Sequence, residues 1–133
     1  MNQLEQAAFE AAVEFQDAYH ILQDQCWMTE DTVKRPGRAI NSPTHVTNCL
    51  YYFRKAKTVL NKFPHPEFRK KLAELYLEFE AVRERAEEII AREYGEDRRR
   101  RPDPGESEYL QAMIDAKPEF ESARQEAELM LKE

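Results

Sequence analysis

Glycine and cysteine are both scarce in this chain, and each shortage excludes a class of site. The 133 residues include three glycines, which almost excludes the glycine-rich loops that cradle phosphates. Cys26 and Cys49 are the two cysteines. They are too few for a disulfide framework and suit a reducing compartment as free thiols. The sequence also contains no Ser-His-Asp set and no nucleotide-binding fingerprint.

Long apolar runs are missing as well. No stretch approaches the roughly 18 apolar residues of a membrane span, and the N-terminus lacks the order of a secretory signal, which is basic, then apolar, then small. We therefore expect a cytoplasmic protein with no membrane partner. A composition of 41% hydrophobic and 35% charged residues, rich in Ala, Glu, Leu, Arg and Lys, favours one helical domain spanning residues 1–133.

Four segments have the apolar periodicity of amphipathic helices. Apolar residues recur at spacings of three and four over about 2–26, from 42 to 63, from 66 to 94 and from about 107 onward. The positions that this periodicity assigns to the core are Leu4, Ala8, Ala11, Phe15, Ala18, Leu22, Val46, Leu50, Phe53, Ala56, Leu60, Phe63, Phe68, Leu72, Leu75, Phe79, Val82, Ala86, Ile89, Tyr109, Met113, Ala116, Phe120, Ala123, Ala127 and Met130.

The connections between these segments predict the topology. Pro64 and Pro66 allow only about four residues between the second and third helices, which forces an antiparallel hairpin. Residues 27–42 and 95–106 are predicted to be long loops. The expected fold is therefore all-α, an up-down-up-down four-helix bundle. Pro118 removes one backbone hydrogen bond from the fourth helix, so we expect a kink or a break near 115–118.

Charge is sorted along the chain. Residues 1–31 carry seven acidic side chains and no Lys or Arg, whereas 32–71 carry ten Lys or Arg against Glu67, in a chain of net charge −6. Such segregation creates strong local fields that steer partners. The sequence therefore predicts an acidic outer face on the first helix and a basic region after it.

Two basic clusters are candidate binding sites for protein or nucleic acid. The hairpin should bring seven cations to one pole, and the loop after the third helix adds four arginines. The candidate residues are Arg54, Lys55, Lys57, Lys62, Arg69, Lys70, Lys71, Arg98, Arg99, Arg100 and Arg101. A solvated surface is the alternative interpretation, in which Lys62 complements a helix dipole. Tyr51 or Tyr52 should turn partly outward beside this pole and could stack on unpaired bases.

Two His and two Cys could converge on a metal. His45 and Cys49 share a helical face, and an antiparallel first helix would bring His20 and Cys26 toward the same level. Such a set could bind zinc tetrahedrally. The spacing between His20 and Cys26 does not fit one helical face, and no C-x-x-C anchors the group. We therefore expect free thiols, no metal and no cofactor.

Six residues separate Arg38 from His45 at a loop-to-helix entry. This spacing resembles the R-x4-6-H signature of HEPN-type RNA-cleaving helical bundles. The resemblance implies that the two residues would line a cleft at a dimer interface and promote cleavage by the RNA's own 2′-hydroxyl. Ala39 follows the Arg, where the family usually has a polar residue, and the motif lies early in the chain.

Trp27, the only tryptophan, has two interpretations. It either caps the core at the end of the first helix or, if exposed, marks an interface anchor. Ala-rich seams in the first and fourth helices also permit close pairing between two copies, so a homodimer is a further alternative.

The expected function is binding without catalysis. We expect an adaptor, inhibitor or assembly factor that docks a protein partner through the acidic face of the first helix or through the basic pole. A nucleic-acid-binding accessory subunit that uses the basic pole and the loop from Arg98 to Arg101 is the second interpretation, although nucleic-acid-binding domains are usually basic overall. A ribonuclease with Arg38 and His45 is the third.

Overall fold

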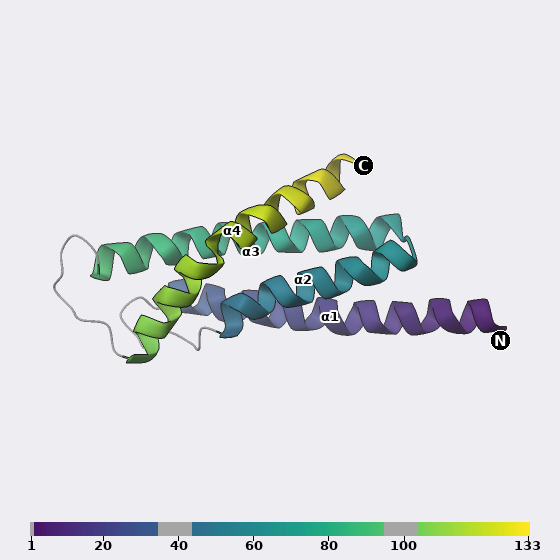
Figure 1. The fold of residues 1–133 in the computed structure, drawn as a ribbon, viewed down its shortest axis with the longest axis horizontal. Helices are drawn as coiled ribbons and strands as arrows, with labels where there is room; N and C mark the ends of the chain where they lie inside the picture. Colours follow the sequence, from purple (N-terminus) through teal and green to yellow (C-terminus); the bar gives the residue numbers. More distant parts are fainter. Residues whose placement is uncertain (1, 35–43, 95–103) are drawn as a thin grey trace.

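The computed structural model describes residues 2–34, 44–94 and 104–133. They form four helices: α1 (Gln3–Lys34), α2 (Thr44–Lys62), α3 (Pro66–Tyr94) and α4 (Pro104–Lys132). The described residues contain no strand. Successive helices run in opposite directions (Figure 1), which confirms the predicted up-down-up-down bundle. No helix in the described residues has the length and apolarity needed to span a membrane.

The helices pack unevenly around the bundle. α1 packs against α2 and α3, and α4 packs against α3 and α2. Within the described ranges α1 and α4 make no contact with each other. The hairpin of α2 and α3 therefore forms the centre of the fold, and α1 and α4 flank it.

The core is close to the one that the sequence predicts. Rings from three helices form a continuous aromatic column, in which Phe53 packs on Tyr76 with centroids 4.4 Å apart. Phe79 follows at 5.6 Å from Tyr76, and Phe120 of α4 lies 5.9 Å from Phe79. The predicted core positions that are buried are Ala11, Phe15, Ala18, Leu22, Leu50, Phe53, Ala56, Leu60, Leu72, Leu75, Phe79, Val82, Ala116, Phe120, Ala123, Ala127 and Met130.

The first helix differs from expectation at both ends. Leu4 is 75% exposed and Ala8 is exposed, because the start of α1 projects beyond the α2–α3 turn (Figure 1). The helix also continues past residue 26 to Lys34, so the predicted loop over 27–42 was wrong for 27–34. Buried Cys26 and Thr29 extend the core stripe of Leu22, and no Gly or Pro interrupts the chain before Pro36.

The turn between α2 and α3 is short, as predicted. His65 caps α3: its Nδ1 accepts a hydrogen bond from the Phe68 amide at 3.2 Å, in the manner of an N-cap side chain. Pro66 occupies the first helical position, where its missing N–H costs nothing. The His65 ring stacks on Phe68, and Phe68 stacks on Phe15 of α1. The hairpin is thus fastened to α1.

The fourth helix bends without breaking. Pro118 lies inside a continuous helix, and α4 changes direction partway along its length in Figure 1. The predicted kink is therefore present, and the predicted alternative of two separate helices is not. The helix begins at Pro104, slightly before the expected start near Ser107.

Candidate functional site

The seven cations of the basic pole fall into groups with different surroundings. They are Arg54, Lys55, Lys57, Lys62, Arg69, Lys70 and Lys71. Lys57 forms an ion pair with Glu126 of α4 at 3.3 Å. Arg69 donates from Nη2 to Glu133 Oε1 at 3.0 Å, and its hydrogen bond and charge lower the pKa of that carboxyl. These two cations therefore attach the end of α4 to the hairpin.

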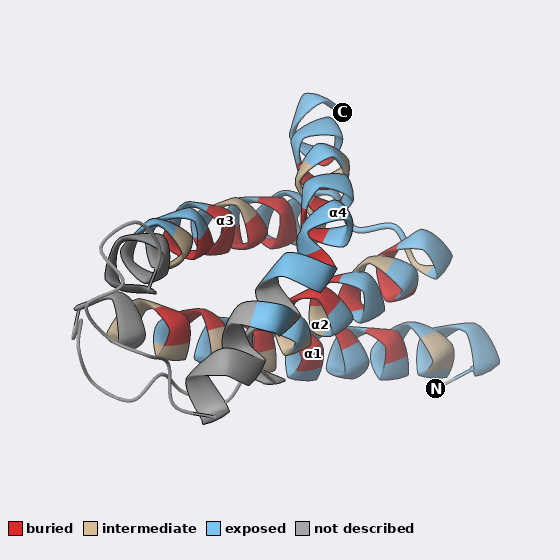
Figure 2. Ribbon diagram, turned by 60° about the vertical axis from the view of Figure 1, so that its left-hand side comes forward, coloured by how far each residue is buried: buried red, intermediate tan, exposed pale blue. Residues whose placement is uncertain are grey.

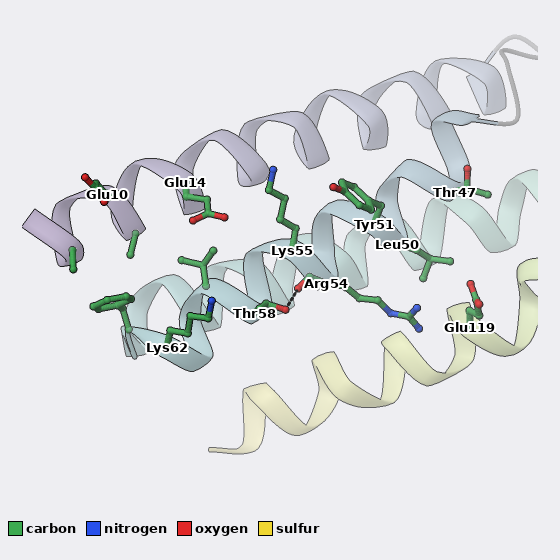
Figure 3. Close-up of a pocket in the computed structure, with 14 residues that line it drawn as sticks. Glu10, Glu14, Thr47, Leu50, Tyr51, Arg54, Lys55, Thr58, Lys62 and Glu119 are labelled. Carbon is green, nitrogen blue, oxygen red and sulfur yellow. Dashed lines mark hydrogen bonds between the residues drawn. The ribbon is translucent and has the colours of Figure 1, made fainter.

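Three other hairpin cations line an open groove. Arg54, Lys55 and Lys62 lie along the outward face of α2, between α1 and α4 (Figure 3). Within the described residues, no carboxylate lies within 4.0 Å of their charged groups. Lys70 is exposed and lies 4.0 Å from Glu74, and Lys71 is exposed. Arg98, Arg99, Arg100 and Arg101 lie outside the described residues.

The groove has a volume of about 690 Å³ and a mixed lining. Side chains such as Leu50 contribute apolar surface, and Tyr51, which is 59% exposed, confirms the prediction of an outward tyrosine. Its carboxylates come from both walls, Glu10 and Glu14 from α1 and Glu119 from α4. Because three carboxylates share the groove with three cations, its attraction for a polyanion is reduced.

The outward face of α1 is a second candidate surface. Phe9 is 58% exposed, Val13 44% and Trp27 65%. They belong to a stripe in which spacings of four and three alternate, as in a heptad seam. We call this the outer stripe, and its members are Phe9, Val13, Gln16, His20, Gln23 and Trp27.

The outer stripe points away from the core. Phe9 and Val13 each stand two residues before a core residue, Ala11 and Phe15, and two helical residues are about 200° apart. Figure 2 shows the resulting alternation of buried and exposed segments along α1. Trp27 is therefore exposed within the helix, and the core-capping interpretation was wrong.

A row of acids borders the outer stripe. Glu10, Asp17, Asp24 and Asp31 recur every seven residues. The first three each follow a stripe residue directly, and Asp31 continues the same interval beyond Trp27. In heptad notation, with Val13 at a and Phe9 at d, all four occupy e, the position whose charge selects a partner helix. The face therefore combines exposed apolar anchors with charge of one sign.

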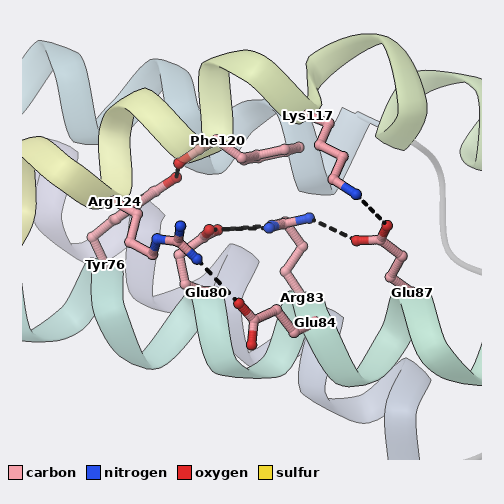
Figure 4. Close-up of polar contacts among 8 residues, drawn as sticks. All are labelled: Tyr76, Glu80, Arg83, Glu84, Glu87, Lys117, Phe120 and Arg124. Atoms are coloured by element: carbon pink, nitrogen blue, oxygen red, sulfur yellow. Dashed lines mark hydrogen bonds and ion pairs between the residues drawn. The ribbon is translucent and has the colours of Figure 1, made fainter.

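A buried ion pair within α3 packs against α4 at a different place (Figure 4). Glu80 and Arg83 are each 3% exposed. Arg83 donates to both Glu80 oxygens, at 2.7 and 3.0 Å. Its guanidinium carbon lies 4.7 Å from the centre of the Phe120 ring. Tyr76 donates its hydroxyl to the Phe120 carbonyl at 3.4 Å.

These contacts make the pair structural. Burial on its own lowers the pKa of Arg83, but the hydrogen bond and charge of Glu80, with the charge of Glu87, raise it above its ordinary value. Burial also raises the pKa of Tyr76. Arg83 stays charged and Tyr76 stays protonated, so neither group changes its protonation state near neutral pH.

The proposed metal ligands do not converge in the described part of the chain. No group of three or more His, Cys, Asp or Glu side chains there could hold a metal ion. His20 is exposed on the outer stripe, whereas Cys26 and Cys49 are buried and form no disulfide. Arg38 and the side chain of His45 lie outside what the structure describes, so the ribonuclease interpretation stays a prediction.

No protein-family model, curated protein or solved structure matches this chain. A functional proposal therefore depends on the surfaces themselves. Sequence reasoning identified the acidity of the first helix but missed the outer stripe. The sequence does contain a signal for this stripe. Its residues, from Phe9 to Trp27, form a second series with heptad spacing beside the series that faces the core.

Proposed function

We propose that this protein is a small protein-binding module, an adaptor, inhibitor or assembly factor, that docks its partner on the outer stripe of α1. One observation carries the proposal: Phe9, Val13 and Trp27 are exposed on one acidic helical face. Exposed aromatic residues with a polar surround are typical anchors of protein interfaces.

The acidity of this face favours a protein partner over a nucleic acid. Residues 1–31 carry no Lys or Arg, so α1 repels phosphates throughout this range. A partner protein can supply apolar contacts for the anchors and cations for the acidic row. Charge complementarity of this kind gives specificity and fast association.

The test is partner capture with matched variants. The stripe variant is Phe9→Ser/Val13→Ser/Trp27→Ser. The control is Ile114→Ser/Leu129→Ser, because these two α4 side chains are 63% and 62% exposed. The wild type and both variants are immobilised and exposed to lysate, and captured proteins are identified by mass spectrometry. Circular dichroism verifies that both variants are folded.

The proposal predicts a reproducible partner that the wild type and the control capture and that the stripe variant loses. Capture of the same proteins by all three forms would contradict it. Loss in the control alone would also contradict it, because the partner would then dock on α4.

A second candidate function is nucleic-acid binding. It is supported by Arg54, Lys55 and Lys62, which lie along one groove beside the exposed Tyr51. Fluorescence anisotropy with labelled RNA and DNA at about 50 and 200 mM salt tests it. Binding that weakens steeply with salt and is lost in Arg54→Glu/Lys55→Glu would favour this function.

A further inference from the structure

We propose that the outer stripe of α1 binds an amphipathic helix whose apolar face is bordered by Lys and Arg. This inference rests on the proposed function and specifies the partner's chemistry. It combines two independent features of α1: the exposed apolar anchors, which none of the other described helices covers, and the acidic row at heptad spacing.

The spacing of the acids determines what the partner must present. Glu10, Asp17 and Asp24 are exposed and lie seven residues apart, and Asp31 continues the row. Helices paired through a heptad seam keep the same interval along both chains. A docked helix would therefore meet this row with cations that also recur every seven residues.

The anchors determine the length and the composition of the partner. From Phe9 to Trp27 the helix axis spans 18 residues, or about 27 Å at 1.5 Å per residue. The partner should thus be a helix of about five turns, with apolar residues near its two ends. Between the anchors, Gln16, His20 and Gln23 are exposed and polar, so its centre should carry small or amide side chains.

Charge argues against a second copy as the occupant. Two α1 helices that met through their outer stripes would bring the acidic row of one copy against that of the other and contribute no cation from residues 1–31. Like charges across a helical seam are destabilising. An anionic membrane surface is repelled for the same reason. A basic helix removes the conflict and gains from the exposed Asp17 and Asp24 of the row.

Trp27 makes the proposal measurable without a label. It is the only tryptophan and lies in the stripe, so burial of its indole on binding shifts its emission to shorter wavelength. The probes are two synthetic helices without tryptophan, identical in their Leu and Ala seam. One carries Lys at the flanking positions, and the other carries Glu.

The Lys helix should bind and shift the Trp27 emission, with affinity that falls as salt increases. The Glu helix should bind at least about tenfold more weakly. The variant Asp17→Asn/Asp24→Asn should weaken binding of the Lys helix about threefold or more. Its control is Glu121→Gln/Glu128→Gln, which removes two exposed acids at the same seven-residue spacing on α4 and should leave binding unchanged.

Three results would overturn the inference: equal binding of the two helices, no binding of either, or equal weakening by the α1 and α4 variants. Concentration-dependent dimerisation that buries Trp27 would assign the stripe to a second copy and would also overturn it. The proposed function fails separately. Stripe-dependent capture of a partner without Lys-helix binding would leave that function intact and reject only this partner class.

Discussion

The first and third helices are similar in length and amphipathicity, but each has exceptions to the rule that apolar side chains are buried and charged ones exposed. The exceptions are of opposite kinds. α3 buries the charged Glu80 and Arg83, whereas α1 exposes Phe9 and Trp27. The difference follows from their neighbours. α3 packs against three helices, and α1 packs against two. Burial in this bundle thus depends on which faces have a neighbour as well as on side-chain polarity.

The two helices consequently divide the work of the protein. Interactions of α3 connect the core to α4, so changes there should alter stability. In our account the outer face of α1 serves recognition, so changes there should leave stability unaffected. Matched substitutions in the two helices can separate these roles.

The largest effect should come from truncating the same residue type in each helix. Phe79 is fully buried in α3, and Phe9 is 58% exposed in α1. Phe79→Ala should lower the free energy of unfolding by about 3–5 kcal/mol, because it leaves a cavity between Tyr76 and Phe120. Phe9→Ala should change it by no more than about 0.5 kcal/mol. Urea denaturation followed by circular dichroism measures both.

A loss of more than about 2 kcal/mol in Phe9→Ala would mean that Phe9 is covered in solution. The contrast between the helices would then be incorrect. A melting temperature that depends on protein concentration would identify a second copy as the cover.

The buried ion pair provides the next comparison. Arg83→Met removes the partner of Glu80 and leaves a buried carboxylate, so the free energy of unfolding should fall by about 3 kcal/mol. Arg85 is exposed in the same helix, and Arg85→Met should have an effect within about 0.5 kcal/mol. Thermal denaturation of the two variants measures the difference.

The double variant Glu80→Gln/Arg83→Met refines this result. Because it removes both charges, it should be more stable than Arg83→Met alone. If instead the double variant is the less stable of the two, the unpaired Glu80 carboxylate is not what destabilises Arg83→Met.

The smallest effect concerns the thiols between α1 and α2. Burial, with the charges of Glu78 and Glu30, raises the pKa of Cys26 from 9.0 to about 11. Burial likewise raises the pKa of Cys49. Both should therefore react with iodoacetamide at pH 8 at least about tenfold more slowly in the folded protein than in urea. Equal rates would show that the thiols are accessible.

The same shift has a consequence for stability. The unfolded chain releases the Cys26 proton near its ordinary value, and the folded chain holds it to about pH 11. Stability should therefore be complete below pH 9 and decrease as the pH rises from 9 toward 11. Replacement of Cys26 by Ala should reduce this decrease.

Helix periodicity was sufficient to predict the bundle and most of its core. The series through Phe15, Leu72 and Phe120 is regular, and a connection of only about four residues that contains Pro64 and Pro66 allows only a hairpin. The end of α1 was less predictable. Nothing in the sequence at Trp27 and Met28 either ends the helix or shows that it continues. The structure shows the continuation, because Thr29 is buried beyond them.

The candidate site was predicted only in part. Sequence reasoning grouped seven hairpin cations, but it could not show that Lys57 and Arg69 pair with Glu126 and Glu133. These carboxylates are distant in sequence, and their approach depends on how α4 lies over α2 and α3. Exposure of the outer stripe likewise depends on which helices stand beside α1, and periodicity alone does not determine this.

Quenching of Trp27 fluorescence tests the central claim, that the outer face of α1 is uncovered and acidic, most directly. The measurement compares neutral acrylamide, cationic caesium and anionic iodide at equal ionic strength, and each quenching constant is taken relative to that of free N-acetyltryptophanamide. The account predicts emission typical of a solvent-exposed indole, efficient quenching by acrylamide, and stronger quenching by caesium than by iodide, because the surrounding acids attract cations. Emission typical of a buried indole that resists all three quenchers, or stronger quenching by iodide, would contradict it.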